Sequence, residues 1–121
     1  MNPSILVVDD QSELRLLVRI TLQPLGKIAT AESAEQAREH IARVPTQLIV
    51  LDVWLGAGQS GLDFCRALKS DPATHDIKVI LLSANGNQPD IDAGMAAGAD
   101  AYIVKPYSPR DLLAKATQLL H

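Results

Sequence analysis

Acidic, hydroxyl and ammonium side chains stand at the ends of four short apolar runs in this chain. The runs cover residues 5–8, 47–51, 79–82 and 101–104, and the polar residues that end them are Asp9, Asp10, Asp52, Ser83 and Lys105. Runs of this length indicate strands buried on both faces, as in a parallel sheet. Ligands of open parallel sheets bind outside the carboxyl ends of the strands. We therefore expect these five side chains at one edge of a sheet, facing whatever binds there.

The three aspartates would crowd together if the strands that precede them are neighbours. In a doubly wound sheet of order 2-1-3-4-5, the first and third strands lie side by side. Three carboxylates within a few ångströms raise one another's pKa, and a Mg²⁺ ion with oxygen ligands and several waters relieves that repulsion. Asp52, alone at the end of the central run, is the carboxylate best placed to attack phosphorus. The cation, Lys105 and Ser83 would neutralise charge on the phosphoryl oxygens.

Strands and helices alternate along the predicted fold. Strands are expected at 4–8, 27–31, 47–52, 78–82 and 101–104, and helices at 12–23, 33–44, 61–69, 89–97 and 108–120. This alternation predicts an α/β fold, a flavodoxin-like doubly wound sheet of five parallel strands with five helices. Ser33 and Ser60 have the spacing of N-terminal caps. The buried face of the first helix is expected to contain Leu14, Leu17, Val18 and Leu22.

The length and composition fit a single domain over residues 1–121. The chain is 47% hydrophobic, its net charge is −3 at pH 7, and Lys and Arg do not cluster. Binding of nucleic acid by this chain is therefore not expected. No apolar run reaches membrane-spanning length, no signal peptide is recognisable, and the single cysteine, Cys65, suits a reducing compartment. A cytoplasmic protein without membrane contact is expected.

The sequence resembles the receiver domain of two-component response regulators, which are CheY-like. The resemblance extends over essentially the whole chain and is carried by four motifs in this order: Asp9-Asp10, Asp52, Ser83-Ala84 and Lys105-Pro106. It implies that Asp52 is the phosphorylated aspartate and that Lys105 pairs with the phosphoryl group. It also implies a cis peptide bond between Lys105 and Pro106.

The same resemblance implies how Mg²⁺ would be bound. Asp10 would be a direct ligand, Asp9 would act largely through water, and Asp52 and the backbone carbonyl of Trp54 would be the remaining protein ligands. Trp54 also brings a large apolar side chain to the position two residues after the acceptor. We expect this side chain to shield the phosphoryl group from water and to slow its hydrolysis.

A conformational switch is implied as well. Ser83 matches the switch hydroxyl, and Tyr102 matches the aromatic residue that turns inward when that hydroxyl moves. The fourth helix, fifth strand and fifth helix would then form the surface that binds a downstream protein. Plainer interpretations stay open, with Ser83 as a turn residue and Tyr102 as a half-buried edge residue. Gly94 in the fourth helix indicates either tight packing or a mobile recognition surface.

The loop after Asp52 departs from the family pattern. That pattern has proline four residues and glycine eight residues after the acceptor, where this chain has Gly56 and Ser60. Glycine follows one position later, at Gly61. We interpret the loop as carrying a one-residue insertion and a freer backbone.

The favoured function is a phosphorylation-dependent switch that is not an enzyme beyond self-catalysed phosphotransfer and autodephosphorylation. Its partner would be a sensor histidine kinase or a histidine phosphotransfer protein, and phosphorylation would shift a two-state population. An aspartyl-nucleophile phosphatase would need a second acid where Trp54 stands. A phosphorylation-independent scaffold, a receiver cut from a longer DNA-binding or enzymatic regulator, and a homodimer stay open.

Overall fold

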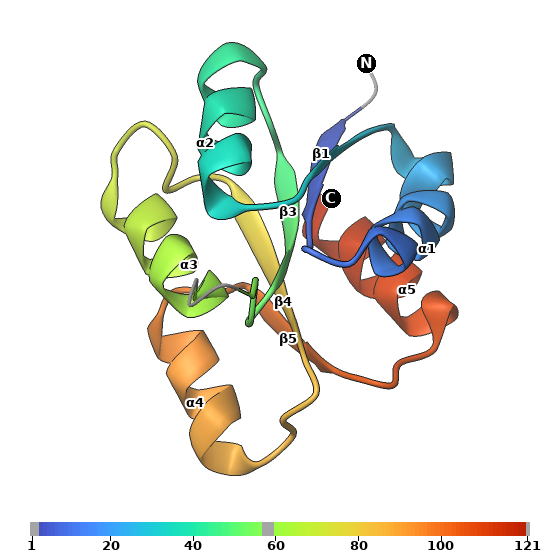
Figure 1. Ribbon diagram of the computed structural model, residues 1–121, viewed down its shortest axis with the longest axis vertical. Helices are drawn as coiled ribbons and strands as arrows, with labels where there is room; N and C mark the ends of the chain where they lie inside the picture. Colours follow the sequence, from blue (N-terminus) through green and yellow to red (C-terminus); the bar gives the residue numbers. More distant parts are fainter. Residues whose placement is uncertain (1–2, 57–59, 121) are drawn as a thin grey trace.

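Five parallel strands form one sheet in the part of the chain that the computed structural model describes, residues 3–56 and 60–120 (Figure 1). The strands are β1 (Ser4–Val8), β2 (Lys27–Ala31), β3 (Leu48–Asp52), β4 (Lys78–Ser83) and β5 (Ala101–Val104). The helices are α1 (Ser12–Leu22), the short 3₁₀ helix η1 (Gln23–Leu25), α2 (Ala34–Arg43), α3 (Gly61–Ser70), α4 (Gln88–Ala96) and α5 (Pro109–Leu120). The sheet order β2-β1-β3-β4-β5 confirms the predicted doubly wound, flavodoxin-like fold.

The register of the strands brings their carboxyl ends to one edge of the sheet. Val8 at the end of β1 is paired with Leu51 of β3, one residue before Asp52. Ser83 at the end of β4 is paired with Val104 at the end of β5. Since all the pairs are parallel, the polar residues that end these strands share one edge, as the sequence predicted.

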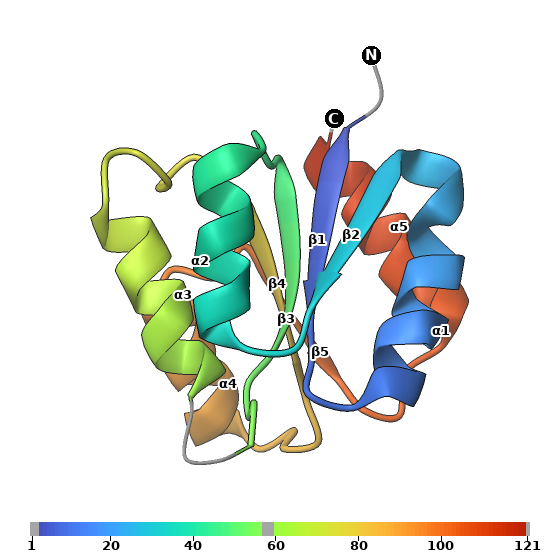
Figure 2. The same cartoon turned by 45° about the horizontal axis from the view of Figure 1, so that its top comes forward.

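Helices cover both faces of the sheet. α1 and α5 lie on one face, and α2, α3 and α4 lie on the other (Figures 1 and 2). Leu48 and Val50 of β3 pack into the core on the first face, whereas Ile49 and Leu51 pack into the core on the second. Because successive side chains of a strand point to opposite faces, β3 is buried along its whole length and its sequence is continuously apolar.

Hydrogen-bonding side chains fix where the helices begin. Ser33 Oγ accepts a hydrogen bond from the Gln36 amide at 3.2 Å, and Ser60 Oγ accepts one from the Asp63 amide at 3.3 Å. Both predicted caps are therefore confirmed. The predicted boundaries of the five helices agree with the structure to within one residue.

The predicted buried face of α1 was wrong at one position. Val18 and Leu22 are buried, but Leu17 is 46% exposed, and Leu16 and Ile20 are more exposed still. The reason is that the sheet and α5 cover only a narrow stripe of α1, and the helical turn carries Leu17 beyond its edge. α1 consequently presents apolar side chains outward.

None of the described helices is long and apolar enough to cross a membrane.

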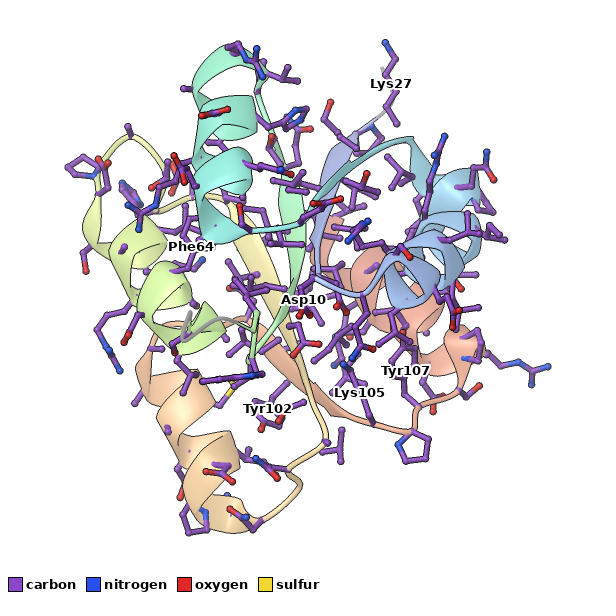
Figure 3. The ribbon with its side chains drawn as sticks, viewed as in Figure 1. Asp10, Lys27, Phe64, Tyr102, Lys105 and Tyr107 are labelled. Carbon is purple, nitrogen blue, oxygen red and sulfur yellow. The ribbon has the colours of Figure 1, made fainter. Side chains whose placement is uncertain are left out.

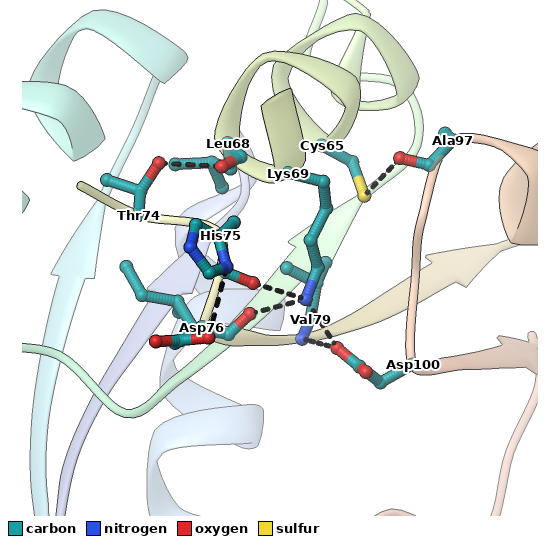
Figure 4. Close-up of polar contacts among 10 residues, drawn as sticks. Cys65, Leu68, Lys69, Thr74, His75, Asp76, Val79, Ala97 and Asp100 are labelled. Atoms are coloured by element: carbon teal, nitrogen blue, oxygen red, sulfur yellow. Dashed lines mark hydrogen bonds and ion pairs between the residues drawn. The ribbon is translucent and has the colours of Figure 1, made fainter. Parts of the chain in front are cut away.

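A partly buried ion pair attaches the segment between α4 and β5 to α3 and β4. Lys69 Nζ lies 2.9 Å from Asp100 Oδ2 and donates to the Ile77 carbonyl at 2.7 Å (Figure 4). The same Asp100 oxygen accepts from the Val79 amide at 2.8 Å. Both charged side chains are less than a quarter exposed, and the Lys69 stem lies against Gly98. The segment that joins α4 to β5 is thus tied to the body of the fold.

Candidate functional site

Asp52 and Lys105 meet at the carboxyl edge of the sheet. Lys105 Nζ lies 2.6 Å from Asp52 Oδ2, and the other oxygen of Asp52 accepts from the Trp54 amide at 2.9 Å. Asp52 is only 8% exposed, so both of its oxygens are held in a largely desolvated setting. The peptide bond from Lys105 to Pro106 is cis. The structure thus brings together two predicted site residues that are 53 positions apart in the sequence.

Asp9 is buried beside this pair. Its side chain is 3% exposed, and its Oδ1 accepts from the Gln11 amide at 2.9 Å. Burial, reinforced by the Asp52 carboxylate, raises the pKa of Asp9 from 3.8 to about 6, although the Gln11 amide and Lys105 act in the opposite direction. Two close carboxylates and one ammonium leave net negative charge in a poorly solvated place. A bound cation would relieve that conflict.

Asp10 is exposed and lies over the loop that follows β3. A Cβ atom built on Gly56, whose φ is +75°, would lie 2.5 Å from Asp10 Oδ2, so the close approach requires glycine there. Figure 3 shows Asp10 and Lys105 pointing toward the same edge of the molecule. Among the described residues, however, no three acidic, His or Cys side chains are close enough to form a metal cluster.

This arrangement differs from the expectation that all three aspartates crowd together. Asp9 and Asp52 interact, whereas Asp10 stands apart. The physical reason is that Lys105 occupies one oxygen of Asp52, and mutual repulsion disfavours a third carboxylate at that place. The donor set still fits Mg²⁺, because this ion takes oxygen ligands, needs few protein side chains and keeps several of its waters.

Ser83 and Tyr102 contact the same residue of the loop after β4. Ser83 is buried, and its Oγ accepts from the Asn85 amide at 3.0 Å. The Tyr102 hydroxyl donates to the Asn85 carbonyl at 2.8 Å. A Cβ atom on Gly94 would lie 2.6 Å from the Tyr102 ring, which favours the packing interpretation of Gly94. Sequence reasoning gave no indication that Asn85 joins the two side chains.

Gly61, the glycine that follows one position later than in the family pattern, is the first residue of α3. A side chain there would overlap the backbone carbonyl of Asp52, and the Gly61 amide donates to the Val53 carbonyl at 2.6 Å. α3 therefore starts directly against the backbone of Asp52. Trp54 forms an isolated β-bridge with Ser60 and is 60% exposed. Positions 57–59 of the predicted insertion lie outside the described residues.

An apolar cavity of about 390 Å³ opens beside the site. It lies between α1 and the loop after β5, and its lining residues are Asp9, Leu14, Leu17, Val18, Leu82, Ala84, Lys105, Pro106 and Tyr107. Burial, together with the charges of Asp9 and Asp52, raises the pKa of Tyr107 above its usual value. The cavity joins the exposed apolar side of α1 to the charged centre. Sequence reasoning missed it, because it is formed by three segments that are far apart in the sequence.

Comparison with known proteins agrees with this geometry. The family model described as the response regulator receiver domain matches residues 5–117. The phosphate regulon transcriptional regulatory protein PhoB of Pseudomonas aeruginosa is 39% identical over an alignment of 121 residues, which covers 99% of this chain and 52% of that protein. PhoB of Escherichia coli is 38% identical over 116 residues, which make up 95% of this chain and 50% of that protein. The chain thus spans about half the length of these curated relatives.

Solved structures of response regulators have the same fold as this chain. The BeF3-activated receiver domain of DrrB has a TM-score of 0.90 and 33% identity, with 99% of this chain and 98% of that chain covered. The chemotaxis protein CheY4 of Vibrio cholerae has a TM-score of 0.89 and 25% identity, with 98% and 99% covered. Family match, sequence relatives and fold therefore agree with the acidic edge described above. The chain belongs to the response regulator receiver domain family, whose members are the phosphoacceptors of two-component signalling.

Proposed function

We propose that Asp52 is the phosphoacceptor and that it takes a phosphoryl group from a phosphohistidine. The observation that supports this most strongly is the buried Asp52 carboxylate, held by Lys105 Nζ and the Trp54 amide at the carboxyl end of β3. A bond forms between one Asp52 oxygen and phosphorus, while the bond from phosphorus to the histidine nitrogen breaks. The electron pair returns to the imidazole. The chain provides its own catalytic groups and turns over no separate substrate.

Lys105 and Ser83 would stabilise the phosphoryl group. Lys105 now contacts an Asp52 oxygen, and its ammonium group can follow the negative charge onto the phosphoryl oxygens. The Ser83 hydroxyl accepts from the Asn85 amide and keeps its own proton free to be donated. Both side chains come from strand ends, so the sheet holds them in position before the reaction.

Receiver domains generally need Mg²⁺ for phosphorylation, and the donor set fits that ion here. We propose that Asp10 binds it directly, that Asp9 binds largely through water, and that Asp52 and the Trp54 carbonyl complete the protein ligands. Bound Mg²⁺ would supply Lewis-acid neutralisation of phosphoryl charge. The buried Asp9 carboxylate contributes the negative charge that attracts the ion.

The response to phosphorylation would pass through Asn85. A Ser83 hydroxyl that turns to the phosphoryl group releases the Asn85 amide, while Tyr102 holds the carbonyl of the same residue. The loop before α4 and the Tyr102 ring would therefore move together, which gives two discrete arrangements for a ligand to select. We propose that a downstream protein binds the surface of α4, β5 and α5 in one of them.

The phosphodonor would dock on the apolar side of α1. Leu16, Leu17 and Ile20 are exposed there, and Leu17 also lines the cavity that opens on Asp9 and Lys105. A partner seated on this patch would lie beside the cavity that reaches Asp9 and Lys105. Contiguous apolar side chains of this kind commonly mark protein-binding surfaces. The partner of this chemistry is a sensor histidine kinase or a histidine phosphotransfer protein.

Phosphotransfer tests the proposal and separates it from its rivals. Incubation with acetyl phosphate and Mg²⁺ should add one phosphoryl group to the wild-type chain and none to Asp52→Asn. A phosphorylation-independent scaffold would bind its partner equally well in both forms. An aspartyl phosphatase would release phosphate from small phosphoesters with turnover, although Trp54 replaces the second acid that such an enzyme needs. Equal labelling of wild type and Asp52→Asn would overturn the assignment.

A further inference from the structure

Arg15 reaches from α1 to the backbone of the acidic pair. Its Nη1 donates to the Asp9 carbonyl at 2.7 Å, and its Nη2 lies 3.3 Å from Glu32 Oε1. The Arg15 side chain is only 14% exposed, whereas that of Glu32 is 63% exposed. Arginine is seldom this buried unless it is paired. The bond to the Asp9 carbonyl is thus the shorter and better protected of the two.

The Asp9 carbonyl belongs to the peptide group that carries Asp10. This group is planar, so the direction of the carbonyl fixes the direction in which Asp10 leaves β1. The Asp9 amide is held by the Ala31 carbonyl at 3.1 Å, and the Gln11 amide is held by Asp9 Oδ1 at 2.9 Å. Arg15 therefore adds a side-chain hydrogen bond from α1 to the carbonyl at this bend of the chain.

Asp10 depends on that backbone for its position. Among the described residues, no hydrogen bond or ion pair holds the Asp10 carboxylate, which is exposed and lies over Gly56. A side chain without partners of its own points where its backbone directs it. A change in the Asp9–Asp10 peptide would move the carboxylate away from the place where a cation would be shared with Asp9 and Asp52.

We infer that Arg15 is a positioning residue for the Mg²⁺ site, acting through the Asp9 carbonyl to direct Asp10. The inference rests on the proposed Mg²⁺ site. The role is geometric rather than electrostatic, because Lys105, not Arg15, is the cation that opposes the raised pKa of Asp9. Loss of such outer partners typically weakens metal binding about 10- to 100-fold. Nothing in the sequence pattern pointed to Arg15, which stands among polar and apolar residues of an ordinary helix.

The test compares three variants with the wild-type chain. Arg15→Met keeps an unbranched apolar stem but removes both bonds, Arg15→Lys keeps the positive charge on a single nitrogen, and Glu32→Gln removes only the outer charge. Mg²⁺ alone is titrated while the amide signals of Asp10 and Gln11 are followed by NMR. Arg15→Met should raise the Kd for Mg²⁺ at least about tenfold, Arg15→Lys should raise it less, and Glu32→Gln should leave it within about twofold.

Amide hydrogen exchange in metal-free protein gives an independent readout. Arg15→Met should speed exchange at Gln11, because the bend that presents Asp9 Oδ1 is loosened, and Glu32→Gln should not. Unchanged Mg²⁺ affinity in Arg15→Met would overturn the inference, and so would equal losses in Arg15→Met and Glu32→Gln. If Arg15→Met does not fold, Arg15→Lys decides in the same way. A wild-type chain without any Mg²⁺ response would refute the proposed Mg²⁺ site, and the exchange rates alone would then judge the bracing role of Arg15.

Discussion

Replacing Asp9 by Asn should stabilise the metal-free fold while it weakens Mg²⁺ binding. Asn keeps the oxygen that accepts from the Gln11 amide and removes the buried charge. The pKa of Asp9 is raised from 3.8 to about 6, chiefly by burial. Each unit of increase in pKa corresponds to about 1.4 kcal/mol of free energy. The buried carboxylate therefore costs the folded state up to about 3 kcal/mol above pH 7.

The sign of this effect depends on pH in a defined way. An acid whose pKa is raised by folding binds more protons in the folded state, so stability falls as pH rises through the interval from 3.8 to about 6. Asp9→Asn should raise the free energy of unfolding by about 3 kcal/mol at pH 8 and by about half of that at pH 5. The increase should be absent below the pKa of the unfolded state. Saturating Mg²⁺ should reduce the advantage, because the wild type gains more binding free energy than the variant.

Urea denaturation in the presence of a chelator measures both effects. Wild type, Asp9→Asn and the control Asp63→Asn are compared at pH 5 and pH 8. Asp63 is exposed, and its carboxylate pairs with Arg66 at the surface, so its variant should change little at either pH. A gain for Asp9→Asn that is the same at both pH values, or no gain at pH 8, would refute the claim that Asp9 is a strained, desolvated carboxylate.

Three other predictions concern separate parts of the molecule. Lys69→Met should lower the free energy of unfolding by about 2–3 kcal/mol, because it leaves the partly buried Asp100 without its cation. Arg66→Met on the same helix should lower it by less than about 0.5 kcal/mol. Equal losses for the two variants in urea denaturation would contradict this. Ile20→Asp should slow phosphotransfer from a phosphohistidine protein about tenfold or more, because the substitution alters the docking patch. Labelling by acetyl phosphate should stay unchanged. Equal slowing of both reactions would argue against docking on α1. Trp54→Asn should dephosphorylate faster than the wild type, because less apolar surface shields the acyl phosphate from water; an unchanged or slower decay defeats that idea.

The sheet and its reactive edge could be predicted because they follow from local rules. Strand β3 is buried on both faces, so its sequence is apolar without interruption. The parallel order then brings Asp9, Asp52 and Lys105 to one edge whatever the details of packing. The hydroxyl oxygens of Ser33 and Ser60 accept hydrogen bonds from the amides three residues later, so these two helix starts depend only on neighbouring residues. Features of this kind need no knowledge of distant contacts.

The rest depends on contacts between distant segments. Leu17 fits a buried helical face by spacing, but the width of that face is set by α5 and the sheet. Lys69 and Asp100 resemble solvated charges until the fold places α3 beside the segment that leads into β5. The direction of Asp10 depends on a loop glycine, Gly56, and on Arg15. Periodicity cannot reveal such partners, because they come from other elements of the fold.

Trapping the acyl phosphate tests the central claim most directly. The wild-type chain is incubated with acetyl phosphate and Mg²⁺, reduced with borohydride, which converts an aspartyl phosphate to homoserine, and mapped by peptide mass spectrometry. Asp52 should be the residue converted, only when Mg²⁺ is present. Conversion at Asp9 or Asp10 in place of Asp52, or no conversion at any aspartate, would contradict the account of the site.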